Sequence, residues 1–282
     1  MKHFGIAPVF IALLLSFFLT AQTQLEEVVV SSPRLNIPFS EDSKSVTVIT
    51  AEQIAETPVS NLVDLLRFQA GIDIRRQGIE GAQADVYLRG GTFDQVLLLI
   101  DGIRVDDPQT GHHTLNSALP LEVIERIEIV KGPAARIYGQ NALTGAINIV
   151  TKKSGKNEVA LTARQGSFNT NHFGATTQNF SDNQQHVVHF SRLNSDGYRY
   201  NTDLDNLHFF THSAFGASKN LKLLTMFNER KFGANGFYGF VSYDKQYEET
   251  QSSLVALTTS FASEKVVWTP RIFWKRGQDE YI

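Results

Sequence analysis

The sequence predicts an α+β domain followed by antiparallel strands of a transmembrane β-barrel, an incomplete one of about seven strands. Three observations predict this fold class. Residues 45–153 mix short helical and strand patterns, residues 154–282 alternate β-rich segments with turns, and the longest apolar run lies at the amino terminus. With 42% hydrophobic residues, the 282-residue chain can form a packed core. The net charge of −3 gives no reason to expect a nucleic-acid partner.

The amino-terminal segment, residues 1–21, has the order of a signal peptide. A basic start, Met1-Lys2-His3, precedes an apolar stretch over residues 4–19, and small residues follow. The stretch is shorter than the roughly 20 residues of a membrane-spanning helix, although a membrane anchor is the alternative. No other apolar segment of the sequence approaches that length. We therefore expect an exported protein that crosses any membrane with strands.

The mixed segment, residues 45–153, reads as one compact domain. The β-branched run Ser45–Thr50 predicts a strand, and a short helix follows until Pro58 ends it. Ser60 is the expected N-cap of a second helix over residues 61–68. The further strands expected in this domain cover residues 72–75, 85–91, 95–100, 103–105, 124–130 and 146–151.

The block from Lys131 to Lys153, KGPAARIYGQNALTGAINIVTKK, closes this domain. Its glycines Gly132, Gly139 and Gly145 can take backbone angles that side chains forbid. The apolar, β-branched residues after Gly145 then predict a strand. The block therefore predicts a turn, a short helical piece, a second turn and a strand.

Four segments in this order resemble the plug domain of TonB-dependent outer-membrane receptors. They are Leu-Arg-Gly at 88–90, Leu-Ile-Asp-Gly at 99–102, Glu-Arg-Ile-Glu-Ile-Val-Lys-Gly-Pro at 125–133, and the closing block. The resemblance implies a plug domain over residues 45–153, the first part of a transmembrane barrel over residues 154–282, and a place in the cell outer membrane. A soluble α/β domain explains any one of these segments but not the series.

The resemblance also implies a function, the TonB-dependent uptake of a scarce ligand across the outer membrane. The sequence of the plug, with GGTFDQVLLLIDGIRVDDPQTGHH followed by GPAARIYG, looks most like cobalamin-receptor relatives from the Bacteroidetes. The alternatives are a ferric-siderophore receptor, a non-transporting plug-bearing binding protein, and a soluble secreted β-rich binding protein. The implied partners are the TonB energy-transducing complex, outer-membrane lipid and a small-molecule ligand, cobalamin or a ferric siderophore, with a surface lipoprotein as a further candidate.

Residues 22–44 are expected to hold a TonB box and a linker. The box itself is placed at Glu26, Glu27, Val28, Val29 and Val30, as an extended, unpaired segment. Such a segment can add a strand to the sheet edge of a partner, with main-chain hydrogen bonds supplying the affinity. The alternatives are a first strand of the next domain and a free tail.

One polar loop of the plug is a candidate ligand-binding loop, because the equivalent plug loops of the family point outward and contact the ligand. The expected ligand-binding residues are Asp106, Asp107, Gln109, Thr110, His112 and His113. Neighbouring histidines in a loop are poorly spaced for a single ion, so we expect no metal and no cofactor. The sequence lacks cysteine and the G-x-S-x-G, H-E-x-x-H and phosphate-loop motifs, which predicts that the protein is no enzyme.

Beyond residue 153 the sequence predicts barrel strands. They are expected near 158–165, 171–180, 185–193, 206–216, 221–231, 250–262 and 265–276. Short turns at 181–184, 217–220 and 263–264 and long connections at 194–205 and 232–249 are typical of outer-membrane barrels. Val255 and Leu257 should share one face of their strand, and Ile272 and Trp274 one face of theirs. Pro270 predicts a bulge or an interrupted pairing, and a soluble β-sandwich is the alternative.

The number of strands is small for the function that the resemblance implies. Transporters with a plugged lumen use about 22 strands, which need on the order of 220 residues. About 130 residues follow the closing block, enough for six or seven strands. We therefore expect the chain to be an amino-terminal fragment or a truncated form. A further hypothesis pairs the plug arginines Arg75, Arg76, Arg89, Arg104 and Arg136 with carboxylates of the barrel wall.

Overall fold

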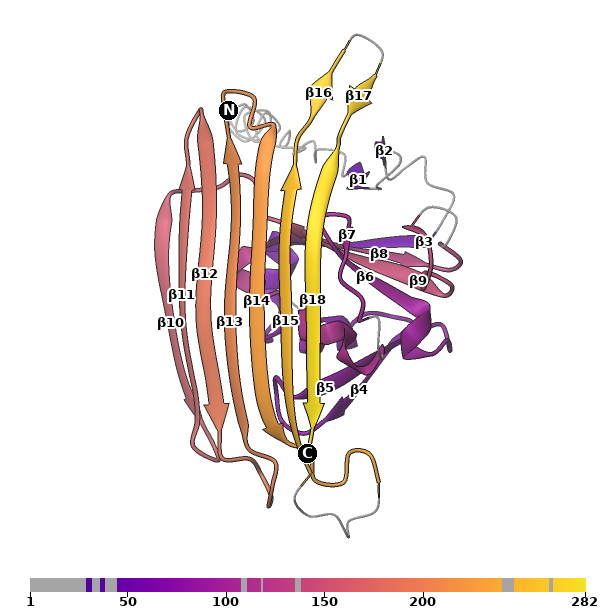
Figure 1. The fold of residues 1–282 in the computed structure, drawn as a ribbon, viewed down its shortest axis with the longest axis vertical. Helices are drawn as coiled ribbons and strands as arrows, with labels where there is room; N and C mark the ends of the chain where they lie inside the picture. Colours follow the sequence, from indigo (N-terminus) through magenta and orange to yellow (C-terminus); the bar gives the residue numbers. More distant parts are fainter. Residues whose placement is uncertain are drawn as a thin grey trace, which may run out of the picture.

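The computed structural model describes residues 29–31, 36–38, 45–107, 111–117, 119–134, 138–239, 246–263 and 266–282. They form an amino-terminal domain that lies against one face of a tall, curved sheet, called the wall below (Figure 1). The predicted signal peptide, residues 1–21, lies outside the described residues. Among the residues described, no helix is both long and apolar enough to cross a membrane.

The amino-terminal domain is built on a five-stranded mixed sheet in the order β3-β8-β9-β6-β7. A separate hairpin pairs β4 with β5. The elements are β3 (Ser45–Thr50), α2 (Ala51–Glu56), α3 (Leu62–Arg67), β4 (Ile72–Gln77), β5 (Gln83–Leu88), η3 (Phe93–Gln95), β6 (Val96–Ile100), β7 (Ile103–Arg104), η4 (Gly111–Ser117), η5 (Leu121–Val123), β8 (Ile124–Lys131) and β9 (Gly145–Thr151). Every residue of β6 and β9 is buried, so their unbroken apolar sequence reflects a sheet covered on both faces.

Most expected elements of this domain are present, with small shifts at their ends. The N-cap of α3 is Asn61 rather than Ser60, because the Asn61 side chain accepts the Asp64 N–H at 2.8 Å. Ser60 instead donates to the carboxylate of Glu80. Asp101 and Gly102 both have positive φ, at 48° and 74°, so the predicted turn joins β6 to β7 in a tight hairpin.

The glycines of the closing block have two different roles. Gly132 and Gly139 take positive φ values of 117° and 93°, as their sequence context predicts. Gly145 does not, but a Cβ there would overlap a methyl group of Leu88 and the backbone oxygen of Val130. This glycine is required by close packing and not by a left-handed backbone.

The wall is a seven-stranded antiparallel sheet in the order β10-β11-β12-β13-β14-β15-β18. Its strands are β10 (Glu158–Gly166), β11 (Thr170–Phe180), β12 (Gln184–Ser195), β13 (Leu204–Phe215), β14 (Leu221–Gly233), β15 (Tyr247–Thr258) and β18 (Arg271–Tyr281). Each pairs with its neighbour in sequence, which confirms the predicted series of hairpins. The sheet remains open between β10 and β18.

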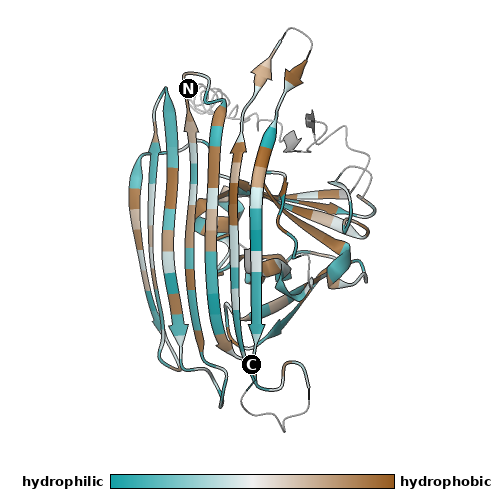
Figure 2. Cartoon of the chain, viewed as in Figure 1, coloured by the Kyte–Doolittle hydropathy of each residue, from teal (hydrophilic) through white to brown (hydrophobic). Residues whose placement is uncertain are grey.

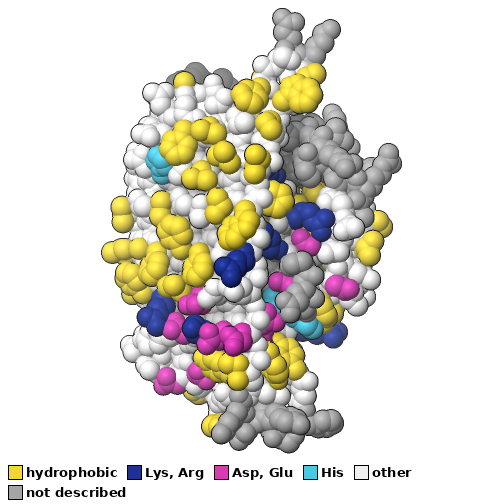
Figure 3. Space-filling view, viewed as in Figure 1, with side chains coloured by type: hydrophobic (Ala, Val, Ile, Leu, Met, Phe, Trp, Pro, Cys, Tyr) yellow, Lys and Arg dark blue, Asp and Glu magenta, His cyan; other side chains and the backbone are white. Residues whose placement is uncertain are grey.

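The two faces of the wall differ in chemistry. Alternate residues of β15 and β18 point away from the amino-terminal domain, and Leu257, Ile272 and Trp274 are 46%, 78% and 54% exposed there. Their strand neighbours Ala256 and Arg271 turn inward instead. Figure 3 shows hydrophobic side chains over the outward face, bounded toward one rim by a row of charged ones. Figure 2 shows the polar and apolar residues alternating along the same strands.

The connection between β15 and β18 carries a short extra hairpin. Strand β16 (Phe261–Ala262) pairs with β17 (Val267–Trp268), where a turn at 263–264 was predicted. The ladder is interrupted at Thr269 and Pro270, and β18 begins directly after them. Since proline has no N–H to donate, this confirms the predicted interruption.

The segment proposed as a TonB box lies mostly outside the described residues, with Glu26, Glu27 and Val28 among those not described. The backbone of its end, in β1 (Val29–Ser31), pairs with β2 (Asn36–Pro38) in a short antiparallel ladder. The prediction that this end is unpaired is therefore wrong in the present structure. Residues 36–38 supply the strand partner.

Candidate functional site

The two adjacent histidines of the predicted ligand loop lie on η4, near the rim where the long loops of the wall gather. His112 is half-buried, and its Nδ1 lies 2.9 and 3.0 Å from the two oxygens of Asp85 on β5. The His112 ring also lies against that of Phe93, with 4.1 Å between the ring centroids. His112 therefore stays within reach of the surface, held in orientation by a carboxylate and a ring.

An aromatic row runs from the amino-terminal domain to the wall through His112. In order it consists of Tyr87, Phe93, His112, Tyr238 and Tyr281, with centroid distances of 5.9, 4.1, 6.4 and 5.5 Å. Tyr238 and Tyr281 are 42% and 50% exposed, so rings with polar ends face solvent at this rim. Such rings offer a planar or apolar ligand large contact area together with hydroxyl groups for orientation.

His113 points the other way, into the wall. It is 7% exposed, and its Nε2 lies 3.0 Å from Glu248 Oε1 on β15 and 3.4 Å from Asp279 Oδ2 on β18. Burial works against the charged imidazole, but the hydrogen bond to Glu248 and the charges of Glu248, Asp279 and Asp107 outweigh it. The pKa of His113 is therefore above its ordinary value.

Tyr238 closes this cluster from the loop that follows β14. Its hydroxyl hydrogen-bonds Glu248 Oε2 at 2.7 Å and also the Gln83 side chain. Burial and the neighbouring Glu248 carboxylate raise the pKa of Tyr238, so the phenol remains a protonated donor. A continuous polar network thus joins the amino-terminal domain, a long loop and two wall strands.

The remaining residues of the predicted ligand loop are only partly described. Asp106 accepts from Arg104 at 3.0 Å and from the Asn141 amide at 2.9 Å, and Lys275 of the wall donates to its backbone oxygen. Asp107 is half-buried, and its negative charge helps to raise the pKa of His113. Gln109 and Thr110 lie outside the described residues. The structure thus brings Asp106 and His113 to the wall, and leaves His112 nearer the surface.

The arginines that join the domain to the wall belong to the wall, and not to the domain as hypothesised. Arg75, Arg76 and Arg104 each pair with a carboxylate of their own domain, so the hypothesis is wrong for these three. Instead, wall cations bind the domain: Arg164 pairs with Glu80 at 2.8 Å, and Arg230 donates to the backbone oxygens of Ala82 and Leu115 at 3.1 and 3.2 Å. Arg136 lies outside the described residues, and for Arg89 the structure gives no wall partner among those described.

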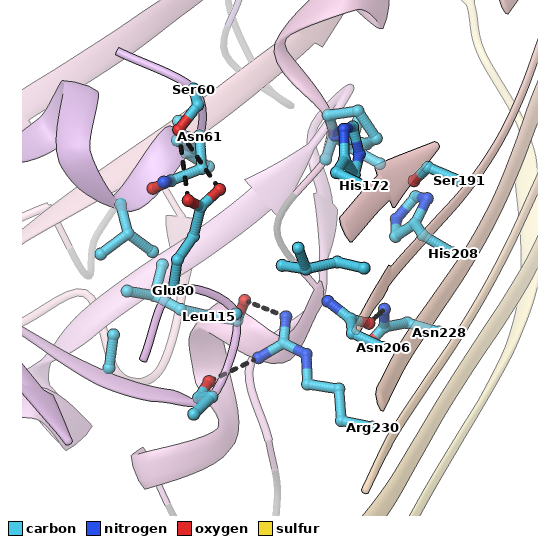
Figure 4. A pocket seen from close by; sticks show the side chains of 18 of the residues that line it. Ser60, Asn61, Glu80, Leu115, His172, Ser191, Asn206, His208, Asn228 and Arg230 are labelled. Carbon is cyan, nitrogen blue, oxygen red and sulfur yellow. Dashed lines mark hydrogen bonds between the residues drawn. The ribbon is translucent and has the colours of Figure 1, made fainter. Parts of the chain in front are cut away.

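These contacts surround a cavity of about 120 Å³, with both polar and apolar lining, between the domain and the wall (Figure 4). Glu80, Arg230, His172 and His208 line it, from both sides. His208 is buried, and neither ring nitrogen has a hydrogen-bond partner among the described residues. A water molecule needs about 10–15 Å³ of such space, so the cavity can hold ordered waters beside its polar side chains.

A second junction lies at the Asp101 turn, away from the long loops. The Asp101 carboxylate accepts from the Thr151 N–H at 3.1 Å and from the Thr151 hydroxyl at 2.6 Å, and Lys153 lies 3.5 Å away. Two wall residues join it, since His212 contacts the Thr151 hydroxyl at 3.1 Å and Arg271 donates to the Asp101 backbone oxygen at 3.0 Å. Burial alone would raise the pKa of Asp101, but Lys153, His212 and the Thr151 hydrogen bonds hold it below its ordinary value.

The Asp101 junction predicts a pH dependence that Asp101→Asn should remove. Because the folded pKa lies below the ordinary value of 3.8, the carboxylate stabilises the fold above that pH and loses its contribution as pH falls toward the folded value. Asparagine tolerates the positive φ at this position, so the backbone should be kept. Thermal midpoints between pH 3 and 7 should show D101N less stable than the wild type at pH 7, with the difference shrinking below about pH 4. A constant difference across this range would contradict the assignment.

Sequence reasoning missed most partners of the two histidines. Gln83, Asp85, Tyr238, Glu248 and Asp279 were not expected at the site. Strand alternation was the one signal in the sequence. Glu248 lies an even number of residues from the buried Leu254 and Ala256 of β15, so its side chain shares their inward face.

Comparisons with known proteins agree with the fold. Residues 39–146 match the family described as the TonB-dependent Receptor Plug Domain. The chain is 38% identical over 133 residues to the vitamin B12 transporter BtuB of Vibrio vulnificus (strain CMCP6), covering 47% of this chain and 22% of that protein. It is 38% identical over 148 residues to BtuB of Vibrio cholerae O395, covering 52% and 24%. The chain thus spans about a quarter of the length of these curated relatives, and their source does not support an origin in the Bacteroidetes.

The likeness in fold extends to solved receptors. The siderophore receptor PiuA of Acinetobacter baumannii superposes with a TM-score of 0.66 at 19% identity, over 90% of this chain and 39% of that one. The ferric-catecholate import receptor Fiu of E. coli gives a TM-score of 0.66 at 18% identity, over 89% and 41%. The relatives named here are transporters and receptors, in agreement with the prediction that the chain is no enzyme. The chain therefore combines a segment that matches the TonB-dependent receptor plug domain with a strand wall, in the fold of solved siderophore receptors.

Proposed function

We propose that this protein takes part in the TonB-dependent uptake of a scarce ligand across the outer membrane, and that the ligand is cobalamin. The observation that carries the choice of ligand is the 38% identity to vitamin B12 transporters over about half of the chain. In such receptors the long loops face outward, so the aromatic row around His112 would meet a ligand arriving from outside. The TonB complex would act on the segment around residues 26–30.

The site chemistry suits a large ligand with a flat apolar part and many amide groups, which is the chemistry of a corrinoid. The exposed rings of Tyr238 and Tyr281 would stack on it, and His112 with its partner Asp85 would supply hydrogen bonds. The ligand-binding role of Asp106, Asp107, Gln109, Thr110 and His113 remains a prediction. So does contact with a surface lipoprotein.

A ferric siderophore is the second candidate. It is favoured by the superposition on receptors of that class, although likeness at below 20% identity concerns the fold alone. Growth separates the two. A strain that lacks this protein should grow poorly on limiting cobalamin and normally on limiting iron, and the gene supplied in trans should restore growth. Unchanged growth on limiting cobalamin would remove the preferred ligand, and a defect on limiting iron would favour the alternative.

Tyr238 is expected to contribute to cobalamin affinity through its ring. Tyr238→Ala should weaken binding about tenfold, or about 1.4 kcal/mol, because one stacking face is lost. Tyr238→Phe keeps the ring and should bind within about twofold of the wild type by the same reasoning. Equilibrium dialysis of the detergent-purified protein measures both. Tyr200→Ala is the matched control, since Tyr200 is 65% exposed on a neighbouring loop and outside the aromatic row. Equal losses for Y238A and Y200A would contradict the role of the row.

A further inference from the structure

Three side chains from distant parts of the sequence bring one ligand atom each to a common point. They are the imidazole of His113 on η4, and the carboxylates of Glu248 on β15 and Asp279 on β18. Their nearest ligand atoms all lie within 4.8 Å of one another. The plug therefore supplies one donor and the wall supplies two, at the junction beneath the aromatic row.

Without a bound ion, the charges and hydrogen bonds of these three side chains are not fully matched. Glu248 and His113 are 1% and 7% exposed, so two carboxylates meet one imidazole largely out of water. The single N–H at His113 Nε2 faces both carboxylates but can donate to only one of them at a time. The buried Asp279 Oδ1 has no hydrogen-bond partner among the described residues. A buried carboxylate is costly unless it is paired, and a cation between the three groups would pair with both carboxylates at once.

The geometry fits a small divalent ion with mixed nitrogen and oxygen ligands. His113 Nε2 lies 3.0 and 3.4 Å from the two carboxylate oxygens. Tetrahedral zinc with bonds of about 2.0–2.2 Å holds its ligand atoms roughly 3.3 Å apart. One imidazole with two carboxylates suits zinc and its neighbours better than calcium, which takes six to eight oxygens. The Tyr238 hydroxyl on Glu248 Oε2 would orient that ligand from the outer shell.

We propose that His113, Glu248 and Asp279 bind a divalent transition-metal ion, with zinc as the ion that fits best. Three protein ligands leave the fourth tetrahedral position for water. The ion ties the plug to two wall strands, so it acts as a clasp at the outward end of their interface. This site is independent of the ligand that the receptor transports, and it stands if cobalamin is not that ligand.

The test is direct zinc binding to the protein. The full protein is purified in detergent, stripped with a chelator and titrated with zinc sulfate by isothermal titration calorimetry. One ion per chain should bind. His113→Gln, Glu248→Gln and Asp279→Asn should each weaken binding by more than about 100-fold, because loss of an outer-shell partner alone costs 10- to 100-fold. Tyr238→Phe should weaken it by about that outer-shell amount.

The chain offers a matched control beside each wall ligand. Glu249→Gln and Glu280→Gln each remove one carboxylate from the adjacent position, whose side chain lies on the other face of the same strand. Both variants should bind zinc as the wild type does. Absence of saturable zinc binding, binding that survives all three ligand variants, or equal losses in the controls would overturn the proposal. Preference for calcium over zinc would overturn the assigned ligand chemistry.

A spectroscopic measurement covers the case in which a ligand variant fails to fold. X-ray absorption of the zinc-loaded wild-type protein should show one imidazole among oxygen ligands, at the distances usual for zinc. An environment of oxygen only, or one with several imidazoles, would place the ion elsewhere and overturn the site. Circular dichroism of each variant identifies those that fold, so only these enter the comparison of affinities.

Discussion

Gly145→Ala is expected to destabilise the plug by more than about 3 kcal/mol, at the upper end of the cost of overpacking. A Cβ at this position overlaps the Leu88 side chain and the backbone oxygen of Val130, and a backbone oxygen in a sheet cannot rotate away. Gly145 also opens β9, which lies between β8 and β6 in the plug sheet. Amide hydrogen exchange in the peptides of β6 and β9 should become fast in the variant, since local stability governs the protection.

Gly71→Ala is the matched control for this prediction. Gly71 has a φ of +81°, but a Cβ there meets no atom within 4 Å. Alanine at Gly71 should therefore cost only the strain of a left-handed backbone, about 1–2 kcal/mol. Protection of β6 and β9 in G145A equal to that in the wild type, or a larger effect from G71A, would contradict the importance of the close approach.

Arg230→Ala is expected to loosen the plug from the wall. The Arg230 guanidinium is buried and donates to the backbone oxygens of Ala82 and Leu115 from a strand of the wall. Its removal leaves two plug carbonyl groups without these donors, at about 1–3 kcal/mol each. Hydrogen exchange should accelerate in the β4–β5 hairpin and in η4, while β6 and β9 keep their protection.

Lys231→Ala is the control for Arg230. Lys231 is the next residue of β14, points to the outer face and pairs with Glu249 at 3.0 Å. A surface ion pair of this kind contributes about 0–1 kcal/mol, so K231A should leave the exchange of the plug unchanged. Equal acceleration in both variants, or acceleration spread over the whole plug in R230A, would contradict a local role at the interface.

The elements that depend only on neighbouring residues could be predicted from the sequence. Strand β3 (Ser45–Thr50) was predicted at its observed bounds, because its β-branched run lies directly before a helix and no distant contact shifts its ends. Alternation placed Ile272 and Trp274 on one face of their strand because the side-chain period of a strand is two, and the structure shows that this is the outer face of the wall. Pro270 interrupted the ladder through its missing N–H, which is a property of the residue itself.

What depends on pairing between distant segments could not be predicted in this way. His112 and His113 are adjacent, yet one bonds Asp85 near the surface and the other enters the wall beside Glu248. Their roles depend on which strand lies next to η4, and no spacing within the loop encodes that neighbour. The partners of the wall residues Arg164 and Arg230 could not be predicted for the same reason. Both partners lie in the plug, far away in the sequence, and contact the wall only in the folded structure.

The contacts between plug and wall are suited to reversible docking. They consist of separate polar junctions at Asp101, around the cavity beside Arg230, and at His113, together with the apolar packing of the shared core. Water can replace each polar contact when the plug is displaced, because a hydrogen bond exchanged with water costs little net free energy. An interface of this kind can hold a plug in place and still allow a mechanical pull to shift it.

The measurement that tests the central claim most directly is the uptake of radiolabelled cyanocobalamin by cells that produce the protein, with and without residues 26–30. We expect that cells with the intact protein bind the vitamin and accumulate it in an energy-dependent manner, and that the deletion keeps surface binding but abolishes accumulation. Accumulation that is unaffected by the deletion would contradict the role of this segment in coupling to TonB. Absence of any protein-dependent binding of cyanocobalamin would contradict the proposed ligand.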